Sequence, residues 1–406
     1  MERVILHCDC NGFFASVELL ERPELAHVPM AVAGDPSSRH GIILAKNELA
    51  KGYGVQTAET IWQAKKKCPD LVLVPPHHDK YMEISRRVNA IYLDYTDLVD
   101  PFGIDESFLD VTASMHLFPM SPRELADVIR ARVRSEIGIT ISVGVSFCRV
   151  FAKLGSDYKK PDATTVIDRE NMESLVWPMP ASALLYVGKR TAETLSRHGI
   201  VTVGDIAGTD PSRLVSLLGE AGEVLWRYAN GKDTEPVRSY YDRPRPKSIG
   251  NGMTFCRNIS GEEEIRAGLS SIVDSVAARL REENCKCTVV QVQIKKPDFR
   301  VVQKQTSLKR ATWLRRDLMD TAMSLVRQAG GYGTMIRSLT VTASGLVSSD
   351  EAEEQLDIFS MGEEADDRFE HVEETMHQIR ARFGKQSIRL GCYAPLDGDG
   401  DGAESP

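Results

Sequence analysis

The chain has 406 residues, which is long enough for two to four domains that each bury a core of their own. It contains no apolar run of about 18 residues and begins without a signal-peptide pattern, so a membrane or secreted protein is not expected. The eight cysteines are scattered without a C-x-x-C pair, which argues against structural zinc and favours reduced thiols in the cytoplasm.

The net charge of −8 hides an uneven distribution along the chain. Residues 244–346 contain 17 Lys and Arg against 9 Asp and Glu, whereas residues 347–406 contain 5 against 16. Local patches rather than the total charge neutralise phosphates, so the acidic total does not exclude a nucleic acid as partner. A charged face that only meets solvent is the alternative interpretation of the basic segment.

The first third of the chain mixes strand-like and helix-like segments. Residues 4–9 form an apolar strand of the buried type that ends on Asp9, and residues 13–20 have helical spacing. Residues 30–33 and 41–44 are strand-like, and residues 79–93 again have helical spacing. Asp9 therefore stands where a strand gives way to a helix.

The stretch Gly103-Ile104-Asp105-Glu106-Ser107 places two adjacent acids at a turn between strand-like residues 99–104 and 107–111. Each carboxylate raises the pKa of its neighbour, and a divalent cation would relieve that repulsion. A solvated Asp-Glu turn is the alternative, since turns favour Asp. If the strand of Asp9 lies in the same sheet, three acids converge into an oxygen-ligand set that suits Mg²⁺.

Such a set of acids has a recognisable chemistry. Two Mg²⁺ ions roughly 3.5–4 Å apart clamp the attacking and leaving oxygens of a phosphoryl transfer. The acids alone therefore predict a nuclease, a cyclase or a nucleotidyl transferase, and they do not choose among the three.

The following segment has the order of a ferredoxin-like domain. Ser121-Pro122-Arg123-Glu124 is a capping box with proline at the first helical position, and it predicts a helix to about Ile137. Residues 140–147 are strand-like and residues 149–158 are helix-like. A strand followed by two helix-and-strand units is what that fold requires.

The second half of the chain separates into a helical part and a sheet-forming part. Residues 181–230 contain two helix–turn–helix units whose glycine turns can expose N–H groups to a phosphate, although an ordinary helical hairpin has the same pattern. Residues 231–246 indicate a linker. A four-stranded sheet with two helices on one face is predicted beyond it, from strand-like 248–255, 288–295, 301–308 and 338–344 and helix-like 271–283 and 313–329.

Three motifs together resemble those of the Y-family (translesion) DNA polymerases, in the family's order and at its spacing. The resemblance is closest to the bacterial DNA polymerase IV branch, and it extends from about Glu2 to Gly345. The motifs are Asp9-Cys10-Asn11-Gly12-Phe13-Phe14-Ala15-Ser16-Val17-Glu18, then Ile104-Asp105-Glu106-Ser107-Phe108-Leu109-Asp110, then Gly144-Val145-Ser146 with Phe151-Ala152-Lys153-Leu154 and Lys160-Pro161.

The resemblance implies an α+β multidomain fold. The family has a ferredoxin-like palm interrupted by a fingers insertion, a helix-hairpin-helix thumb and a C-terminal four-stranded α/β little-finger domain. In this numbering the implied parts are palm 1–10 and 77–165, fingers 11–76, thumb 166–232, linker 233–243, little finger 244–346 and acidic tail 347–406.

The resemblance also implies a metal site. Asp9, Asp105 and Glu106, with the backbone carbonyl of Cys10, would bind two Mg²⁺ ions. One ion would activate the primer 3′-hydroxyl, and the other would hold the triphosphate and its leaving group. Glu106 is expected to be the least dispensable of these residues.

Nucleotide contacts are implied in the same way. Phe14 matches the steric gate, an aromatic ring that leaves no space for a 2′-hydroxyl, and Phe13 would support it. Taken without the family, Phe14 is equally well a core aromatic of its helix. Lys160 matches a lysine that contacts the triphosphate, and Lys51 is a candidate for the same task.

Two places depart from the common family pattern. Where many relatives have Thr, Tyr and Arg near the β- and γ-phosphates, this chain has Ala45, Glu48 and Lys51. Lys51 can replace the arginine as a point charge without its bidentate geometry, and Lys46 or Asn47 are candidates to compensate. In the first thumb loop, Tyr186 replaces one of two glycines.

The tail contains a short candidate docking peptide. Gln355-Leu356-Asp357-Ile358-Phe359 is similar to the peptide by which bacterial polymerases bind the sliding clamp. Its Leu, Ile and Phe would enter an apolar pocket while Gln355 forms a hydrogen bond at the rim. A chance match is the alternative for so short a motif. Residues 370–383 are helix-like and have no assigned role.

The resemblance implies a low-fidelity, template-directed DNA polymerase that extends primers past damage. It would bind primer-template DNA and deoxynucleoside triphosphates, act as a monomer, and work at the nucleoid in the cytoplasm. A silent family member that only recruits partners would be expected to lose the metal-binding acids, which this chain retains. A two-metal nuclease or cyclase leaves Phe14, the hairpin thumb and the basic domain unexplained.

Overall fold

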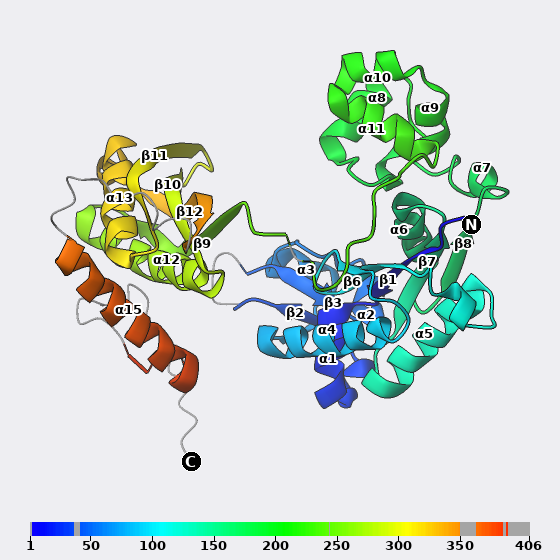
Figure 1. The fold of residues 1–406 in the computed structure, drawn as a ribbon, viewed down its shortest axis with the longest axis horizontal. Coiled ribbons are helices and arrows are strands. Elements are labelled where there is room, and N and C mark those ends of the chain that lie inside the picture. Colours follow the sequence, from blue (N-terminus) through cyan, green and yellow to red (C-terminus); the bar gives the residue numbers. More distant parts are fainter. Residues whose placement is uncertain (1, 36–40, 243, 350–362, 385–386, 389–406) are drawn as a thin grey trace. The chain divides into compact units, whose positions relative to one another are not determined.

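The computed structural model describes residues 2–35, 41–242, 244–349, 363–384 and 387–388 (Figure 1). The chain divides into two compact units, Met1–Arg243 and Pro244–Pro406. No helix among the described residues is long and apolar enough to cross a membrane.

The centre of the first unit is a five-stranded sheet in the order β5-β6-β1-β7-β8. Its strands are β1 Ile5–Cys10, β5 Val99–Pro101, β6 Glu106–Asp110, β7 Ile141–Ser146 and β8 Thr164–Ile167. Neighbouring strands are antiparallel except β7 and β8, which are parallel. The pattern of the sequence indicated four of these strands, and β8 was not predicted.

The two faces of this sheet carry different helices. The side chains of Leu6, Cys8 and Cys10 pack with α4 (His78–Leu93) and α5 (Pro122–Ile137). The alternate residue Ile5 packs with Ala152 of α6 (Arg149–Tyr158) on the other face. The residues of β1 with odd numbers, including Asp9, therefore belong to the α6 face.

Helices α5 and α6 begin and end close to where the sequence predicts. Ser121 and Glu124 form the expected capping box, and α5 ends at Ile137 before Gly138, which has a left-handed φ of 90°. Helix α6 lies very close to β7, since a Cβ at Gly144 would come within 1.8 Å of the carbonyl oxygen of Ala152. Only glycine permits that approach.

A smaller three-stranded sheet follows β1, in the order β3-β2-β4, with β2 and β4 parallel. The described elements of this segment are α1 Phe13–Glu21, the 3₁₀ turn η1 Pro23–His27, β2 Met30–Ala33, β3 Ile43–Lys46, α2 Glu48–Gly52, α3 Ile61–Lys67 and β4 Val72–Val74. Among the described residues of the unit, two 3₁₀ turns occur later, η2 Met115–Leu117 and η3 Ala181–Ala183.

The remainder of the first unit is helical, and the segment after its last helix packs against the five-stranded sheet and α6. Its helices are α7 Met172–Leu175, α8 Lys189–Arg197, α9 Val203–Gly208, α10 Pro211–Leu218 and α11 Glu220–Ala229. The segment after α11 was predicted as a linker. Within it, Val237 is buried beside Ile5 and Phe108, and the backbone carbonyl of Pro236 accepts a hydrogen bond from Arg149.

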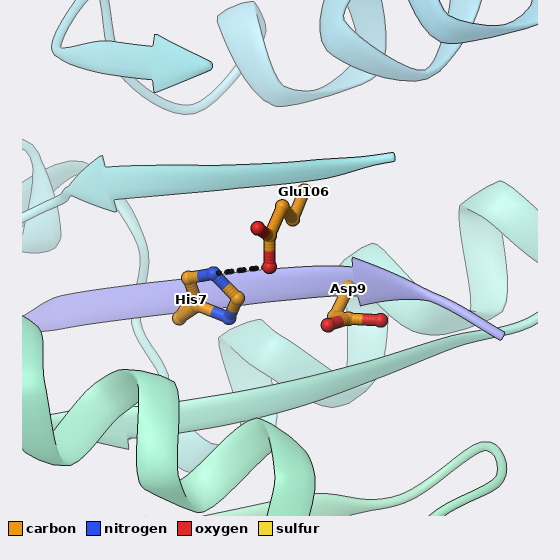
Figure 2. A group of neighbouring side chains, drawn as sticks. All are labelled: His7, Asp9 and Glu106. Atoms are coloured by element: carbon orange, nitrogen blue, oxygen red, sulfur yellow. Dashed lines mark ion pairs between the residues drawn. The ribbon is translucent and has the colours of Figure 1, made fainter. Parts of the chain in front are cut away.

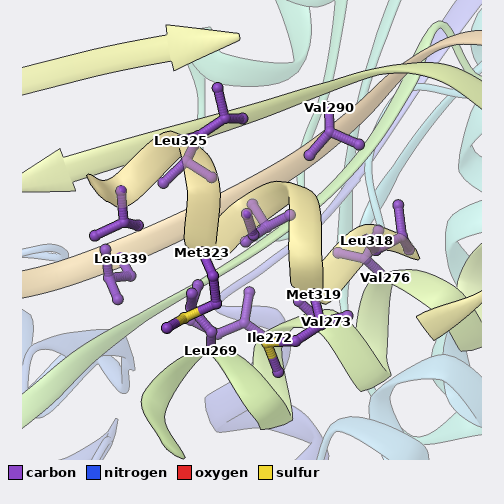
Figure 3. Packing of buried hydrophobic residues seen from close by; sticks show 14 of the residues in the cluster. Leu269, Ile272, Val273, Val276, Val290, Leu318, Met319, Met323, Leu325 and Leu339 are labelled. Atoms are coloured by element: carbon purple, nitrogen blue, oxygen red, sulfur yellow. The ribbon is translucent and has the colours of Figure 1, made fainter. Parts of the chain in front are cut away.

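The second unit is the predicted four-stranded sheet with helices on one face. Its antiparallel strands lie in the order β11-β10-β12-β9. The core lies between the sheet and two helices, and Leu269, Leu318 and Val290 are among the residues that form it (Figure 3). The bounds are β9 Ser248–Ile259, α12 Glu262–Glu282, β10 Cys285–Lys295, β11 Val301–Thr312, α13 Arg315–Gln328, the 3₁₀ turn η4 Gly331–Gly333 and β12 Ile336–Ser348.

A further helix of the second unit, α15 (Glu363–Phe383), begins seven residues before its predicted start and contacts α12 and β10. Glu373 forms an ion pair with Arg281 of α12 and accepts a hydrogen bond from the backbone N–H of Arg315 at 3.0 Å. Glu370 lies 3.3 Å from Lys286 of β10. Acidic residues of the tail are thus paired with basic residues of the sheet-forming unit.

Candidate active site

The sheet places two of the predicted acids opposite each other on neighbouring strands. Asp9 on β1 is the cross-strand partner of Glu106 on β6. The sequence pattern placed both Asp105 and Glu106 at a turn, but Glu106 is the first residue of β6. Asp105 precedes the strand, and its carbonyl accepts a hydrogen bond from the N–H of Cys10 at 2.9 Å. Residues separated by about a hundred positions therefore form one cluster.

Sequence reasoning missed a fourth member of this cluster, His7. It lies two residues before Asp9 on β1, so both side chains lie on the α6 face. One ligand atom from each of His7, Asp9 and Glu106 lies within 4.8 Å of the others (Figure 2). The signal that could have found His7 is its period-2 spacing from Asp9.

Two lysines pair with the carboxylates. Lys153 of α6 places its Nζ 2.5 Å from Oε2 of Glu106 and 3.1 Å from Oδ2 of Asp9. Lys160 places its Nζ 2.9 Å from Oδ1 of Asp9 and 2.8 Å from Asp157. Burial disfavours both ammonium charges, but the surrounding carboxylates outweigh it and raise the pKa of each lysine.

The acids of the cluster respond differently to this environment. Burial disfavours the charge of Glu106, but the nearby His7 and the hydrogen bond from the Lys153 ammonium outweigh it and lower its pKa to about 2. Burial, followed by the charges of Asp9 and Glu106, raises the pKa of Asp105. Burial lowers the pKa of His7 and favours the neutral imidazole, against the opposing influence of the nearby Glu106 carboxylate.

These residues fit a divalent cation. Asp9, Asp105 and Glu106 supply carboxylate oxygens, the donors that Mg²⁺ and similar hard cations prefer. Burial first, and then the charges of Asp9 and Glu106, disfavour the ionised form of Asp105, and a cation among the three carboxylates would offset both effects. The cluster can therefore support metal-assisted chemistry at a phosphate.

An aromatic stack lies on the helix that follows Asp9. The ring of Phe14 stacks on Tyr81 of α4 with a centroid distance of 4.1 Å and an interplanar angle of 13°. The Tyr81 hydroxyl donates a hydrogen bond to the buried carboxylate of Glu18. Phe13 is buried in the core beside Phe14, with ring centroids 5.8 Å apart. The structure therefore holds the Phe14 ring from one side.

The residues on and beside the three-stranded sheet that were predicted to contact phosphate do not form one cluster, because each has a separate partner. Lys51 lies on α2 and pairs at 3.1 Å with Glu48, and both side chains are exposed. Asn47 is fully used as the cap of α2, since its amide also bonds the carbonyl of Val28 at 2.7 Å. Lys46 donates a hydrogen bond to Thr57 at 3.2 Å. Of the two candidates for compensation, only Lys46 has a side chain that is not a structural cap.

The remaining candidate residues lie elsewhere. Cys10 is buried at the end of β1, beside the site. Tyr186, in the loop before α8, has a left-handed φ of 68° and an exposed ring. The peptide Gln355–Phe359, including Leu356, Asp357 and Ile358, lies outside the described residues.

Comparison with known proteins places these features in a family. The sequence model described as "impB/mucB/samB family" matches residues 8–157, and that described as "impB/mucB/samB family C-terminal domain" matches residues 246–358. The chain is 42% identical to DNA polymerase IV of Acetivibrio thermocellus, over 96% of this chain and 97% of that protein. It is 34% identical to DNA polymerase IV 1 of Bacillus subtilis, over 96% and 93%.

A solved structure agrees with the architecture. The Y-family DNA polymerase chimera Dbh-Dpo4(243-245)-Dbh superposes with a TM-score of 0.76 at 22% identity, covering 85% of this chain and 99% of that one. At this identity the likeness concerns the fold. It confirms the predicted α+β multidomain architecture.

Proposed function

Because the chain belongs to the impB/mucB/samB family of Y-family DNA polymerases, we propose that Asp9, Asp105 and Glu106 form its catalytic centre. The protein is a template-directed DNA polymerase of translesion synthesis, which binds primer-template DNA and nucleotides and uses a divalent metal. The direct pairing of Asp9 with Glu106 beside Asp105 is the observation that carries the assignment.

We propose two Mg²⁺ ions as the cofactors. Asp9 and Glu106 would hold them from neighbouring strands, Asp105 from the preceding turn, and Cys10 through its backbone carbonyl. When bound, the ions lower the barrier to attack by the primer 3′-hydroxyl and neutralise charge on the triphosphate. Lys153 and Lys160 orient these carboxylates through the ion pairs described above.

The nucleotide would lie between the carboxylates and the aromatic stack. Phe14, held against Tyr81, would exclude the 2′-hydroxyl of a ribonucleotide, and Phe13 would fix the backbone beneath it. Lys160 is close enough to Asp9 to exchange that contact for a phosphate of the nucleotide. Lys51 would add a charge from α2, without bidentate geometry.

The family also suggests how the rest of the chain serves the site. We assign the palm to residues 1–10 and 77–165, the fingers to 11–76, the thumb to 166–232 and the little finger to 244–346, joined by 233–243. The basic balance of the little finger suits phosphate contacts along the duplex. Gln355–Phe359 would bind the sliding clamp, with the polymerase itself a monomer that works at the nucleoid in the cytoplasm.

The test is primer extension with the full chain, Mg²⁺ and deoxynucleotides, comparing the parent with Glu106→Gln. Removal of this ligand should lower single-turnover extension by at least about a hundredfold while the affinity for primer-template DNA stays unchanged. Glu83→Gln, an exposed acid of α4, is the matched control and should extend normally. Template-directed extension by Glu106→Gln at the parental rate would refute the assignment of the centre.

A further inference from the structure

We propose that helix α3 carries a binding surface for the unpaired template strand, where Trp62 stacks on a nucleobase and Lys65 and Lys66 contact the phosphates. The inference rests on the proposed function, since it takes primer-template DNA as the substrate. The surface lies outside the proposed catalytic centre. It would therefore act on the affinity for DNA and not on the chemical step.

Helix α3 has one buried side and one side that faces solvent. Ile61 and Ala64 are buried in a small core that also contains Ile43 of β3. Trp62, in contrast, is 70% exposed, although an indole ring gains more than most side chains from burial. The helix also contains three lysines and no acid. An exposed aromatic ring among positive charges is typical of surfaces that bind single-stranded nucleic acid.

The three lysines of α3 are not equivalent. Lys67 forms an ion pair with Glu59 at 2.5 Å, so its charge is already compensated. Lys66 lies over the indole of Trp62, with its Nζ 5.5 Å from the ring centroid. Neither Lys65 nor Lys66 forms an ion pair within the part of the chain that the structure describes. Because they follow Trp62 by three and four positions, both uncompensated charges lie on its side of the helix.

Contacts within the first unit connect α3 with the proposed nucleotide site. The backbone at Gly12, two residues before Phe14, lies against β3, because a Cβ there would stand 3.3 Å from the carbonyl oxygen of Lys46. On its other side, β3 is bonded to the segment that leads into α3. The N–H of Ala58 donates a hydrogen bond to the carbonyl of Ile43 at 2.8 Å. One strand therefore separates the proposed steric gate from the segment that begins α3.

A surface hollow of about 420 Å³ lies beside this segment. It is lined by Thr57, whose hydroxyl accepts a hydrogen bond from Lys46 at 3.2 Å, and by Gln63 of α3. The amide oxygen of Gln63 accepts from the N–H of Thr60 at 3.1 Å, and its NH₂ group is a further donor. The hollow thus places a concave, hydrogen-bonding surface next to the helix that carries Trp62.

The chemistry of this surface favours an unpaired DNA strand as its occupant. In a duplex the faces of the bases are covered by their neighbours, so an indole stacks readily only on a base that is unpaired. An acidic protein segment would suit the lysines, but it would not supply a flat ring for Trp62. The substrate of a template-directed polymerase contains a single strand, the template ahead of the primer end. That strand fits both the indole and the lysines.

The first measurement is the affinity of the full chain for two primer-templates, followed by fluorescence anisotropy. One has an unpaired template overhang of about six nucleotides, and the other is the same duplex with a blunt end. Trp62→Ala should weaken binding to the overhang substrate about tenfold and leave binding to the blunt duplex unchanged, since only the overhang supplies an unpaired base. Trp62→Phe, which keeps an aromatic face, should recover most of the loss. Leu117→Ala, at an exposed residue of η2, is the control and should bind both substrates normally.

The lysines have a separate signature in the salt dependence of binding. Each phosphate contact to a single strand contributes about 0.7 to the slope of log affinity against log salt concentration. Lys65→Gln combined with Lys66→Gln should therefore reduce the magnitude of this slope by about one on the overhang substrate, without change on the blunt duplex. An equal reduction on both substrates would mean that the lysines contact the duplex, and it would overturn the assignment to the unpaired template.

Two results for Trp62→Ala would overturn the proposal. Parental affinity for the overhang substrate would leave the exposed indole to another kind of partner, such as a protein. Equal weakening on both substrates would place the contact on the duplex. Because Trp62 is exposed, Trp62→Ala should keep the Tm of the parent, and this is measured alongside binding.

These outcomes are distinct from a failure of the proposed catalytic centre. Binding is measured without turnover, so an active Glu106→Gln would refute the centre and leave the result for Trp62 unaffected. At saturating DNA, Trp62→Ala should extend primers at the parental single-turnover rate. The loss should then appear in the KM for the overhang substrate and not in kcat.

Discussion

At the residue scale, the sugar selectivity of the polymerase should depend on one ring. Phe14 stacks on Tyr81, and Tyr81 is anchored by the buried Glu18, so the position of the ring is fixed before a nucleotide binds. Phe14→Ala should raise ribonucleotide incorporation relative to deoxynucleotide by at least about tenfold, measured as the ratio of the two kcat/KM values. Phe383→Ala, an exposed aromatic of α15, serves as control, and unchanged selectivity in Phe14→Ala would contradict the steric gate.

The ionised carboxylate of Asp105 should lower the free energy of unfolding of the metal-free protein. Burial and the charges of Asp9 and Glu106 raise its pKa, so ionisation of Asp105 destabilises the folded state. This cost is fully present above the raised folded-state pKa and disappears as the pH falls below the ordinary value of about 4. Asp105→Asn should therefore raise the Tm of the metal-free protein at neutral pH, with a gain that shrinks on acidification and on addition of Mg²⁺. The measurement compares Tm from about pH 4, the ordinary pKa of aspartate, to about pH 8. Equal Tm values for the parent and Asp105→Asn across this range would disprove the prediction.

At the scale of elements, the loop before α8 carries measurable backbone strain. Tyr186 occupies a left-handed φ of 68° that a glycine would adopt without cost, and its ring is 63% exposed. Tyr186→Gly should raise the free energy of unfolding of the first unit by about 0.5–1 kcal/mol, the strain relieved less the entropy of glycine. The control is Tyr241→Gly, an exposed tyrosine without positive φ, which should bring no gain. A loss of stability in Tyr186→Gly would mean that ring contacts, including that to Tyr228, outweigh the strain.

At the scale of the whole molecule, the candidate clamp peptide connects two segments of the second unit. Strand β12 ends at Ser348, and α15 begins at Glu363 and pairs with Arg281 and Lys286. A tethered peptide raises the local concentration of the polymerase at its partner. Phe359→Ala should therefore abolish stimulation of extension by the sliding clamp while leaving extension without clamp unchanged. Deletion of residues 397–406 is the control; equal stimulation of Phe359→Ala would make the peptide a coincidence.

The local rules of the sequence predicted most elements well. The capping box at Ser121 gives the start of α5, and the apolar pattern gives β1 and α6, because these depend on neighbours within a few residues. Strand β8 was missed because it depends on pairing with β7 across the intervening helix α6, and β5 is shorter than predicted because its pairing with β6 ends at Pro101. Composition predicts a linker after α11, but the burial of Val237 follows from contacts with Ile5 and Phe108 that composition does not encode.

The sequence by itself determined the identity of the acids, the aromatic pair after Asp9 and the family to which they point, because those motifs are contiguous in the chain. Only the tertiary structure decided that Asp9 faces Glu106, that Lys153 and Lys160 join them, and that His7 lies beside both acids. The physical reason is that strand register and the approach of α6 to Gly144 set these distances. The pairing of Asp9 with Glu106 joins strands about a hundred residues apart, and the contacts of Lys153 and Lys160 with Asp9 span a still longer stretch of chain, which no local pattern records.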